Sequence, residues 1–393
     1  GANVSFTGIN FEGQGVVNIQ NNKIGSINIT GSGNTRFRGI NVSWGTNGNF
    51  QTISNNTIGG NVVNSISNST NHDTYGIDAS STAPNYTISG NTVRNLVATN
   101  TSTAGELWGI YSQGALSNIT GNTVKDLSTS TTSSTIQLIG IAVSNTSSNG
   151  NTISQNTVHS LTQANSGSGT THHAYGIYVN VGTTSATTVS RNLIHSLRLS
   201  TTGSAITTQI RGIDVLAGSV NIINNMIRVG LYSDGSSVTG GYFVQGISIQ
   251  SGGVTNTHFN SVYVGGSAVT GSQPTHGIRK SNTSGTHDIR NNILFNARSN
   301  SSGSGKHYSI LLNGTTGVTS NFNLFFVNGT GGVFASADNG TTDRASLSAW
   351  QAATGFDGSS GFGDPNYVAP TGTSATLDLH VQSPTPIEGQ GIA

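Results

Sequence analysis

The chain of 393 residues carries 15 Lys and Arg against 14 Asp and Glu, so its formal net charge is +1 and charged residues make up only 7%. So few basic residues cannot neutralise a run of phosphates, which argues against nucleic acids and anionic membrane surfaces as partners. The absence of Cys excludes disulfides and thiolate metal sites. The sequence contains no stretch of 18 apolar residues, which is about the length that a membrane-spanning helix requires.

Two short motifs recur along the chain with a common period of about 34 residues, which indicates a repeat architecture. The first motif is Gly-Ile, and its glycines are Gly39, Gly76, Gly109, Gly140, Gly176, Gly212, Gly246 and Gly277. The second motif is apolar-x-x-Asn-x-apolar, and its asparagines are Asn22, Asn56, Asn91, Asn122, Asn156, Asn192, Asn225, Asn260 and Asn292.

Short strands are predicted throughout the repeats. Val4, Phe6, Ile9 and Phe11 alternate with other residues and predict a first strand. In each later unit apolar and polar residues alternate briefly and then break at Gly, Asn or Ser, as at 175–179, 187–189 and 192–197. Three strands per unit would form one coil, and about ten coils stacked about 4.8 Å apart would give a rod of roughly 50 Å.

The repeated Asn has a physical reason in such a solenoid. A sharp turn between two strands requires a left-handed residue, and Asn adopts this conformation more readily than other non-glycine residues. Stacked coils would also align the Asn side chains in a hydrogen-bonded ladder. We therefore predict a structural role for this row.

The end of the chain differs from the repeats. Residues 1–335 are predicted to form the β-helix, whereas residues 336–393 lose the period, contain Trp350 and hold four of the six prolines. We predict that residues 336–393 form a C-terminal cap with a short helix at Leu347–Ala353, because the last coil would otherwise expose its core. The first strand is predicted to be uncapped, with further chain or another subunit before it. Any export signal would lie outside this sequence, since the residues from Gly1 onward contain neither the basic nor the apolar region of a signal peptide.

The repeats resemble a known superfamily. Ile-Ser-Asn-Asn-Thr-Ile at 53–58 and Ile-Thr-Gly-Asn-Thr-Val at 119–124, each paired with a Gly-Ile strand, are similar to right-handed parallel β-helix proteins of the pectate-lyase-like superfamily. They resemble in particular the large exported cell-surface proteins of Bacteroidetes-type bacteria. The C-terminal runs at 347–351 and 377–381 resemble the terminating segment of such proteins. The resemblance implies an all-β, right-handed parallel β-helix with a ligand groove along the Gly-Ile sheet.

The Gly-Ile strands would carry one row of residues on their outer surface. If Ile177 and Val179 point inward, alternation places Gly176 and Tyr178 outward. Long polar runs at 98–107, 162–174, 199–210 and 231–244 would leave each coil at one corner and flank this surface. The equivalent outward positions form a row of Asn41, Asp78, Tyr111, Ala142, Tyr178, Asp214, Ser248, Arg279 and Leu311.

This row lacks the carboxylate pair of a polysaccharide hydrolase. Such enzymes need two carboxyl groups within about 10 Å, whereas Asp78 and Asp214 lie four coils apart, about 19 Å. A lyase would need a base and a cation, for which Asp214, Arg279 or His276 could serve. A surface ion pair between Asp214 and Arg279 is the commoner outcome. We therefore predict no catalytic residue, no metal site and no cofactor.

Four residues remain as candidate binding residues. Tyr111 and Tyr178 would lie two coils, or about 10 Å, apart and could stack on alternate sugar rings, although exposed tyrosines are also common in strands. Asp214 and Arg279 complete the set.

The histidines lack metal-binding spacing. His172-His173 and His72-Asp73 have no third ligand nearby in the sequence and are predicted to be solvated loop residues. His159 and His195 follow the Asn turns of consecutive coils and are predicted to lie in a row facing solvent.

Three functions remain open from the sequence. The favoured one is a non-catalytic, exported cell-surface or extracellular filament or adhesin module, whose polar loops contact polysaccharide, other surface glycans, copies of itself or further domains. The alternative is a polysaccharide lyase or glycoside hydrolase acting along the Gly-Ile sheet. The third is a phage tail-fibre β-helix, which would be a trimer.

Overall fold

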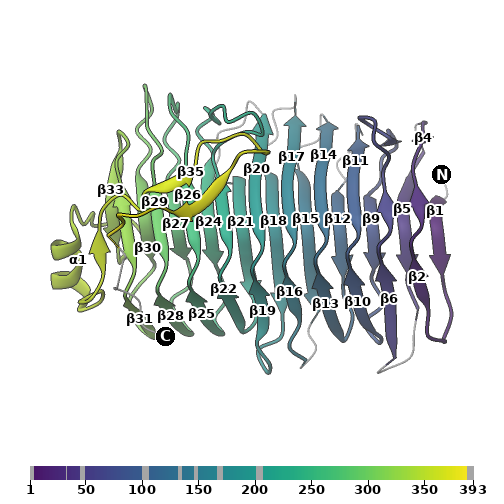
Figure 1. Cartoon of the computed structure of the whole chain (residues 1–393), viewed down its shortest axis with the longest axis horizontal. Helices are drawn as coiled ribbons and strands as arrows, with labels where there is room; N and C mark the ends of the chain where they lie inside the picture. The colour runs from purple at the N-terminus through teal and green to yellow at the C-terminus, as the bar shows by residue number, and fades with distance from the viewer. Residues whose placement is uncertain are drawn as a thin grey trace.

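The computed structural model describes residues 4–31, 33–44, 49–99, 106–131, 135–145, 149–165, 171–200 and 207–386. The strands stack along one axis into an all-β parallel solenoid of about ten coils (Figure 1), which confirms the predicted fold class. Three parallel sheets run the length of the rod, and each takes one strand from almost every coil.

The Gly-Ile strands form sheet A. Its strands, in spatial order, are β1 (Val4–Phe11), β5 (Thr35–Val42), β9 (Thr74–Ala79), β12 (Leu107–Ser112), β15 (Thr135–Asn145), β18 (Thr171–Val181), β21 (Thr208–Ala217), β24 (Phe243–Ile249), β27 (Thr275–Lys280), β30 (His307–Leu312) and β33 (Gly332–Ser336).

Sheet B precedes the Asn turn in each coil. Its strands are β2 (Asn18–Gln20), β6 (Phe50–Ser54), β10 (Asn85–Ser89), β13 (Leu116–Thr120), β16 (Thr152–Ser154), β19 (Thr187–Ser190), β22 (Val220–Ile223), β25 (Val254–His258), β28 (Thr286–Arg290) and β31 (Val318–Asn321).

Sheet C follows the Asn turn. Its main strands are β3 (Lys23–Ile24), β7 (Thr57–Ile58), β11 (Thr92–Ala98), β14 (Thr123–Thr131), β17 (Thr157–Asn165), β20 (Leu193–Ser200), β23 (Met226–Val229), β26 (Ser261–Val264), β29 (Ile293–Asn296), β32 (Leu324–Val327) and β34 (Gly361–Phe362), with β4 (Ile27–Ile29) and β8 (Ile66–Asn68) at the N-terminal end.

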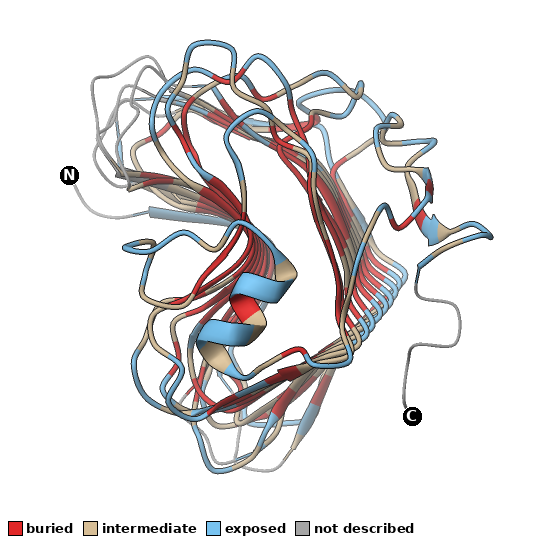
Figure 2. Cartoon of the chain, turned by 90° about the vertical axis from the view of Figure 1, so that its left-hand side faces the viewer, coloured by how far each residue is buried: buried red, intermediate tan, exposed pale blue. Residues whose placement is uncertain are grey.

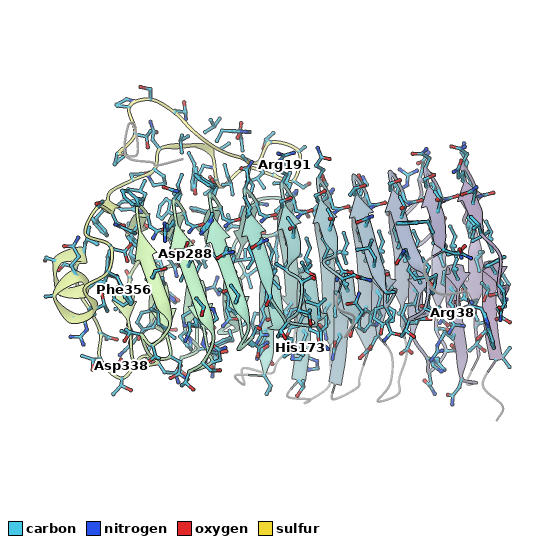
Figure 3. All side chains as sticks on the ribbon, turned by 90° about the horizontal axis from the view of Figure 1, so that it is seen from below. Arg38, His173, Arg191, Asp288, Asp338 and Phe356 are labelled. Carbon is cyan, nitrogen blue, oxygen red and sulfur yellow. The ribbon has the colours of Figure 1, made fainter. Side chains whose placement is uncertain are left out.

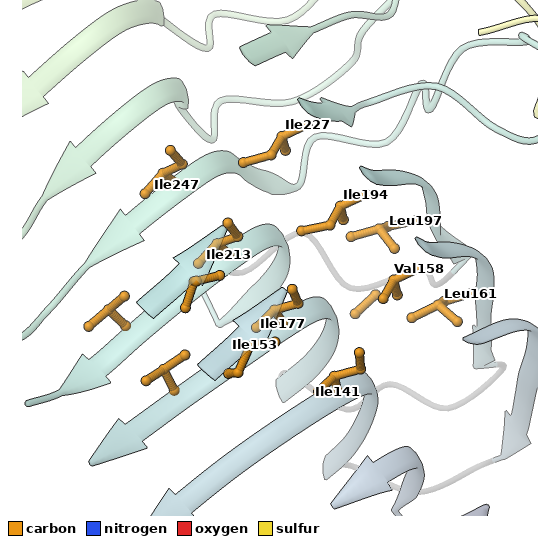
Figure 4. Packing of buried hydrophobic residues seen from close by; sticks show 14 of the residues in the cluster. Ile141, Ile153, Val158, Leu161, Ile177, Ile194, Leu197, Ile213, Ile227 and Ile247 are labelled. Carbon is orange, nitrogen blue, oxygen red and sulfur yellow. The ribbon is translucent and has the colours of Figure 1, made fainter. Parts of the chain in front are cut away.

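The core is a column of aliphatic side chains inside the three sheets (Figure 4), and buried residues line the inside of the coils along the rod (Figure 2). In one coil Ile177 comes from sheet A, Val189 from sheet B and Ile194 from sheet C, and all three are fully buried. Each such residue pairs in register with an apolar equivalent in the next coil, as Ile177 does with Ile213. Burial of one side chain of this size contributes about 1.5–3 kcal/mol, so stacking supplies the core that a single coil lacks.

The predicted asparagine ladder is present and extends one coil further, to Asn323. From Asn22 onward each Nδ2 donates to Oδ1 of the next Asn at 2.9–3.1 Å. The prediction that these Asn residues are left-handed is wrong, because the preceding residue has the positive φ. That residue is Asn21, Asn55, Gly90, Gly121, Gln155, Arg191, Asn224, Phe259, Asn291 or Phe322. The left-handed residue turns the chain, so that the side chain of the next Asn points inward.

The C-terminal segment closes the last coil. The predicted helix is present as α1 (Leu347–Thr354), and Trp350 inserts its fully buried ring into the end of the core. Asp357 ends the ladder, since its carboxylate accepts hydrogen bonds from Nδ2 of Asn323 at 3.0 Å and from Nε1 of Trp350 at 2.8 Å. A carboxylate suits this place because it accepts hydrogen bonds and donates none.

After the cap, the chain folds back along the rod. Strands β35 (Tyr367–Ala369) and β36 (Asp378–Val381) form an antiparallel hairpin over the outer face of sheet C (Figure 1). Tyr367 and Leu379 of the hairpin pack against Tyr263, Phe295 and other apolar residues of that face. Among the described residues, the single helix is too short to cross a membrane.

Candidate functional site

The Gly-Ile motif interrupts the inward and outward alternation in those strands of sheet A that carry it. A Cβ on Gly176 would lie 2.4 Å from Cγ2 of Ile194 and 2.6 Å from the carbonyl oxygen of Gly212, so Gly176 faces the core, as Ile177 does. The prediction that Gly176 points outward is therefore wrong. Two successive inward residues interrupt the alternation, and a residue without a side chain permits this close packing. Tyr175 and Tyr178 consequently lie together on the outer face, with ring centroids 6.3 Å apart.

The outer face of sheet A thus carries two adjacent rows. The pairing register places the nine residues of the predicted row side by side, one per coil. Sequence reasoning missed the second row, which consists of the residues before the eight motif glycines and of Tyr308, which precedes Ser309 in the next strand. Those residues are Arg38, Tyr75, Trp108, Ile139, Tyr175, Arg211, Gln245, His276 and Tyr308.

Five aromatic side chains from the two rows form what we call the aromatic platform: Tyr75, Trp108, Tyr111, Tyr175 and Tyr178. Tyr75 stacks on Trp108 at 6.1 Å between centroids, and Trp108 meets Tyr111 edge-on at 4.7 Å. Tyr111 and Tyr178 are half-exposed, and burial raises the pKa of both to about 12. Both phenols are therefore neutral at physiological pH and can donate a hydrogen bond.

The platform is continuous across the coil between its two aromatic groups. Ile139 and Ala142 occupy that coil and are fully buried between the rings. This apolar cluster lies on the outside of the solenoid, away from the core column. Tyr111 and Tyr178 are two coils apart, in the order β12, β15, β18, as predicted.

A pocket of about 360 Å³ adjoins the platform. Tyr178 and His173 lie on one side of it, and Arg211, Asp214 and Gln250 on the other. His173 stacks on Tyr175, and burial together with the charge of Arg211 lowers the pKa of His173 to about 4. The pocket therefore combines aromatic surfaces with hydrogen-bonding groups and a neutral imidazole.

The predicted ion pair between Asp214 and Arg279 is absent. Asp214 is 1% exposed and bonds Arg211 of its own strand at 2.7 Å and Nε2 of Gln250 at 3.0 Å. The bend at Gly212 places Arg211 and Asp214 on the same face, so the nearer arginine takes the carboxylate. Arg279 lies over the Phe243 ring at 5.1 Å, and burial and the charge of Arg211 lower its pKa to about 10.

Asp78 and Asp214 do not form the pair that a hydrolase uses. Asp78 and Asp214 are separated by the strands β12, β15 and β18, as predicted. Asp78 is 2% exposed and bonds Nε of Arg38 at 2.5 Å. Burial raises the pKa of Asp78, and Arg38 opposes this rise. Glu106, which sequence reasoning missed, accepts a hydrogen bond from Nε1 of Trp108 at 2.9 Å, and burial and Asp73 raise its pKa to about 7.

Polar groups continue along the face beyond the pocket. Gln245 and His276 are fully buried and paired in register, and Ser248 is 1% exposed. Both amide atoms of Gln245, both ring nitrogens of His276 and the Ser248 hydroxyl have no hydrogen-bond partner among the described residues. Unpaired buried polar atoms are costly, but because these three side chains are covered they offer no exposed surface to a ligand.

The histidine predictions need correction. His172 is fully buried on the inner side of β18, and His173 lies on its outer side, so neither is a solvated loop residue. His159 and His195 stack in parallel at 4.7 Å, and His195 is only 2% exposed. Nδ1 of each ring is also 2.9 Å from the hydroxyl of the following Ser, Ser160 or Ser196, so the row is stacked and hydrogen-bonded rather than solvated.

Other predictions lie partly beyond the described chain. Of the flanking runs, residues 100–105, 166–170 and 201–206 lie outside the described residues. The run at 231–244 is described, and Ser233 accepts a hydrogen bond from Ser374 of the segment that joins β35 to β36. Within the described ranges, no cluster of three His, Asp or Glu residues could hold a metal ion.

Comparison of the chain with known protein families, with curated proteins and with solved structures finds no match.

Proposed function

We propose that the chain is a non-catalytic rod module that binds an extended polysaccharide along the outer face of sheet A. The observation that carries the proposal is the aromatic platform beside a pocket of hydrogen-bonding groups. Flat rings can pack on the apolar faces of sugars, while a few placed polar groups select their hydroxyls. The one-coil spacing of about 4.8 Å suits a polymer that lies along the axis.

The stiffness of the solenoid and the resemblance to exported bacterial surface proteins support a place outside the cell, as a surface or filament adhesin. Stacked coils make a semi-rigid rod with an extended binding surface. The few charges and abundant Ser, Thr and Asn are consistent with this role. A pectate-lyase-like relationship belongs to the same proposal.

The test is the affinity of Tyr178→Ala for a polysaccharide that the wild type retains on a glycan array. Loss of a stacking ring worth about 1 kcal/mol weakens binding roughly fivefold. Phe50→Ala is the control, because Phe50 is 45% exposed on sheet B, away from the platform. Equal affinity of Tyr178→Ala and wild type would remove the platform from the binding site.

A second candidate, glycoside hydrolysis, is favoured by Glu106. A carboxyl group with a pKa of about 7 is half-protonated at neutral pH, as a general acid requires. Asp73 is close, since the backbone N–H of Glu106 donates to its Oδ1 at 3.3 Å. Reducing ends released by the wild type and not by Glu106→Gln would establish this activity, and their absence from both would leave binding as the function.

A further inference from the structure

The outer face of sheet B carries a regular array of small polar side chains. In five consecutive strands, from β6 to β19, the two outward positions hold Thr or Asn and then Ser or Thr. The pairs are Thr52 and Ser54, Thr87 and Ser89, Asn118 and Thr120, Thr152 and Ser154, and Thr188 and Ser190. We call these ten residues the hydroxyl array.

The array is two-dimensionally periodic. Its strands pair in parallel without any shift of register, so equivalent residues stand in straight rows along the rod. The rows step by about 4.8 Å from coil to coil, and the two residues of one strand are about 6.7 Å apart. Figure 3 looks onto this side of the rod, where Asp288 marks sheet B beyond the array and Arg191 marks the adjoining corner.

The array offers hydrogen bonds that the protein does not use. None of its ten residues is charged, and none of their side chains bonds another described residue. Ser54 is 8% exposed, and its hydroxyl oxygen is not among the fully buried unpaired atoms, so solvent reaches it. The hydroxyl groups of the array are therefore free to bond water or a surface with hydrogen-bonding groups.

The array ends where its chemistry changes. Past β19 the outward positions become Asn221 and Ile223 on β22, and then Asn256 and His258 on β25. An ion pair of Asp288 and Arg290 follows on β28. The strands that carry a Ser or Thr at the second outward position are therefore those from β6 to β19.

We propose that the hydroxyl array binds the surface of ice. Five of the ten residues are Thr, which offers a methyl and a hydroxyl group, and the Ser and Asn residues add further hydrogen-bonding groups. A stiff lattice of such groups orders its hydration water with the period of the strands. The two spacings of the array are close to the two repeats of the hexagonal ice lattice. The ordered water on the array can therefore continue into the ice crystal. Because the array carries no charge, it brings no counter-ions to the interface, and ice excludes ions. This face is distinct from the aromatic platform on sheet A.

The test measures how the full chain partitions into slowly grown ice and how it slows ice recrystallisation. Two substitutions, Thr120→Tyr and Thr152→Tyr, place a large ring on the array. The controls are Thr123→Tyr and Thr157→Tyr, in the same two coils on sheet C, where the residues are Thr with similar half-exposure. Circular dichroism checks that all four variants keep the fold.

We expect the wild type and both controls to enter ice and the two array variants to lose at least tenfold in activity. Exclusion of the wild type from ice would overturn the proposal. Equal activity of wild type and array variants would overturn it as well, since another face would then bind. Adsorption of the wild type to microcrystalline cellulose, lost in the array variants and without any effect on ice, would assign the face to a different ordered surface.

Discussion

Removal of one ladder side chain should destabilise the centre of the rod. The Asn156 side chain makes four hydrogen bonds in the buried ladder: Nδ2 donates to Ile119 O at 2.9 Å and to Asn192 Oδ1 at 3.0 Å, and Oδ1 accepts from Asn122 N–H at 2.9 Å and Nδ2 at 3.0 Å. Asn156→Ala leaves the Asn122 N–H and the Ile119 carbonyl without these partners. At about 1–3 kcal/mol for each unsatisfied group, we expect a loss of about 3–5 kcal/mol.

The assay is amide hydrogen exchange, because a solenoid can open locally and one global unfolding energy need not describe it. We expect faster exchange in β13, β16 and β19, with smaller changes at both ends of the rod. Gln155→Ala is the matched control, since Gln155 is exposed, has a φ of 57° and is not part of the ladder. An opening free energy that falls by less than about 1 kcal/mol in Asn156→Ala would refute the assigned role of the ladder.

Three further predictions concern the glycine bend, the cap and pH. Gly176→Ala should cost about 2–3 kcal/mol by overpacking, measured by chemical unfolding, whereas Gly15→Ala, with nothing within 4 Å of its Cβ, should change little. Asp357→Asn should lower the stability of the last coils by about 2 kcal/mol, measured by hydrogen exchange. The substitution replaces one acceptor oxygen by an NH2 group, which cannot accept the hydrogen bonds that Asn323 and Trp350 donate to the carboxylate. Burial lowers the pKa of His195 to about 3 and of His307 to about 4. The unfolded chain therefore binds more protons below pH 6.5, and stability should fall by about 1.4 kcal/mol per pH unit per histidine down to about pH 4. In His195→Gln the unfolding free energy should depend on pH less steeply than in the wild type, by about 1.4 kcal/mol per pH unit between about pH 6.5 and pH 4, and an unchanged slope would contradict the assignment.

The repeat period was sufficient to predict the solenoid, because stacking makes each coil a copy of its neighbour. The ladder and the short helix were also predictable, since the Asn motif and Trp350 carry local signals. The left-handed residue was misplaced by one position, although six of the ten left-handed residues are Asn or Gly; the other four, Gln155, Arg191, Phe259 and Phe322, give no propensity signal for a positive φ. Tertiary packing selects that conformation there.

The candidate site was predicted only in part, for a physical reason. Alternation placed Tyr178 and Asp214 correctly on the outer face, but it cannot anticipate the bend at the motif glycine. That bend brings Tyr175 and Arg211 to the same face, supplies the partner of Asp214 and completes the aromatic platform. A Gly that recurs in the middle of each predicted strand was the available signal, since such glycines often mark bends or bulges.

The central claim is that the outer face of sheet A binds a polysaccharide without cleaving it. The most direct measurement incubates the wild-type chain with a panel of plant, algal and bacterial polysaccharides and follows both retention and released products. The proposed function predicts retention of at least one polysaccharide at full length, weakened by Tyr178→Ala. Release of unsaturated or reducing-end products, or retention of none of the panel, would contradict it.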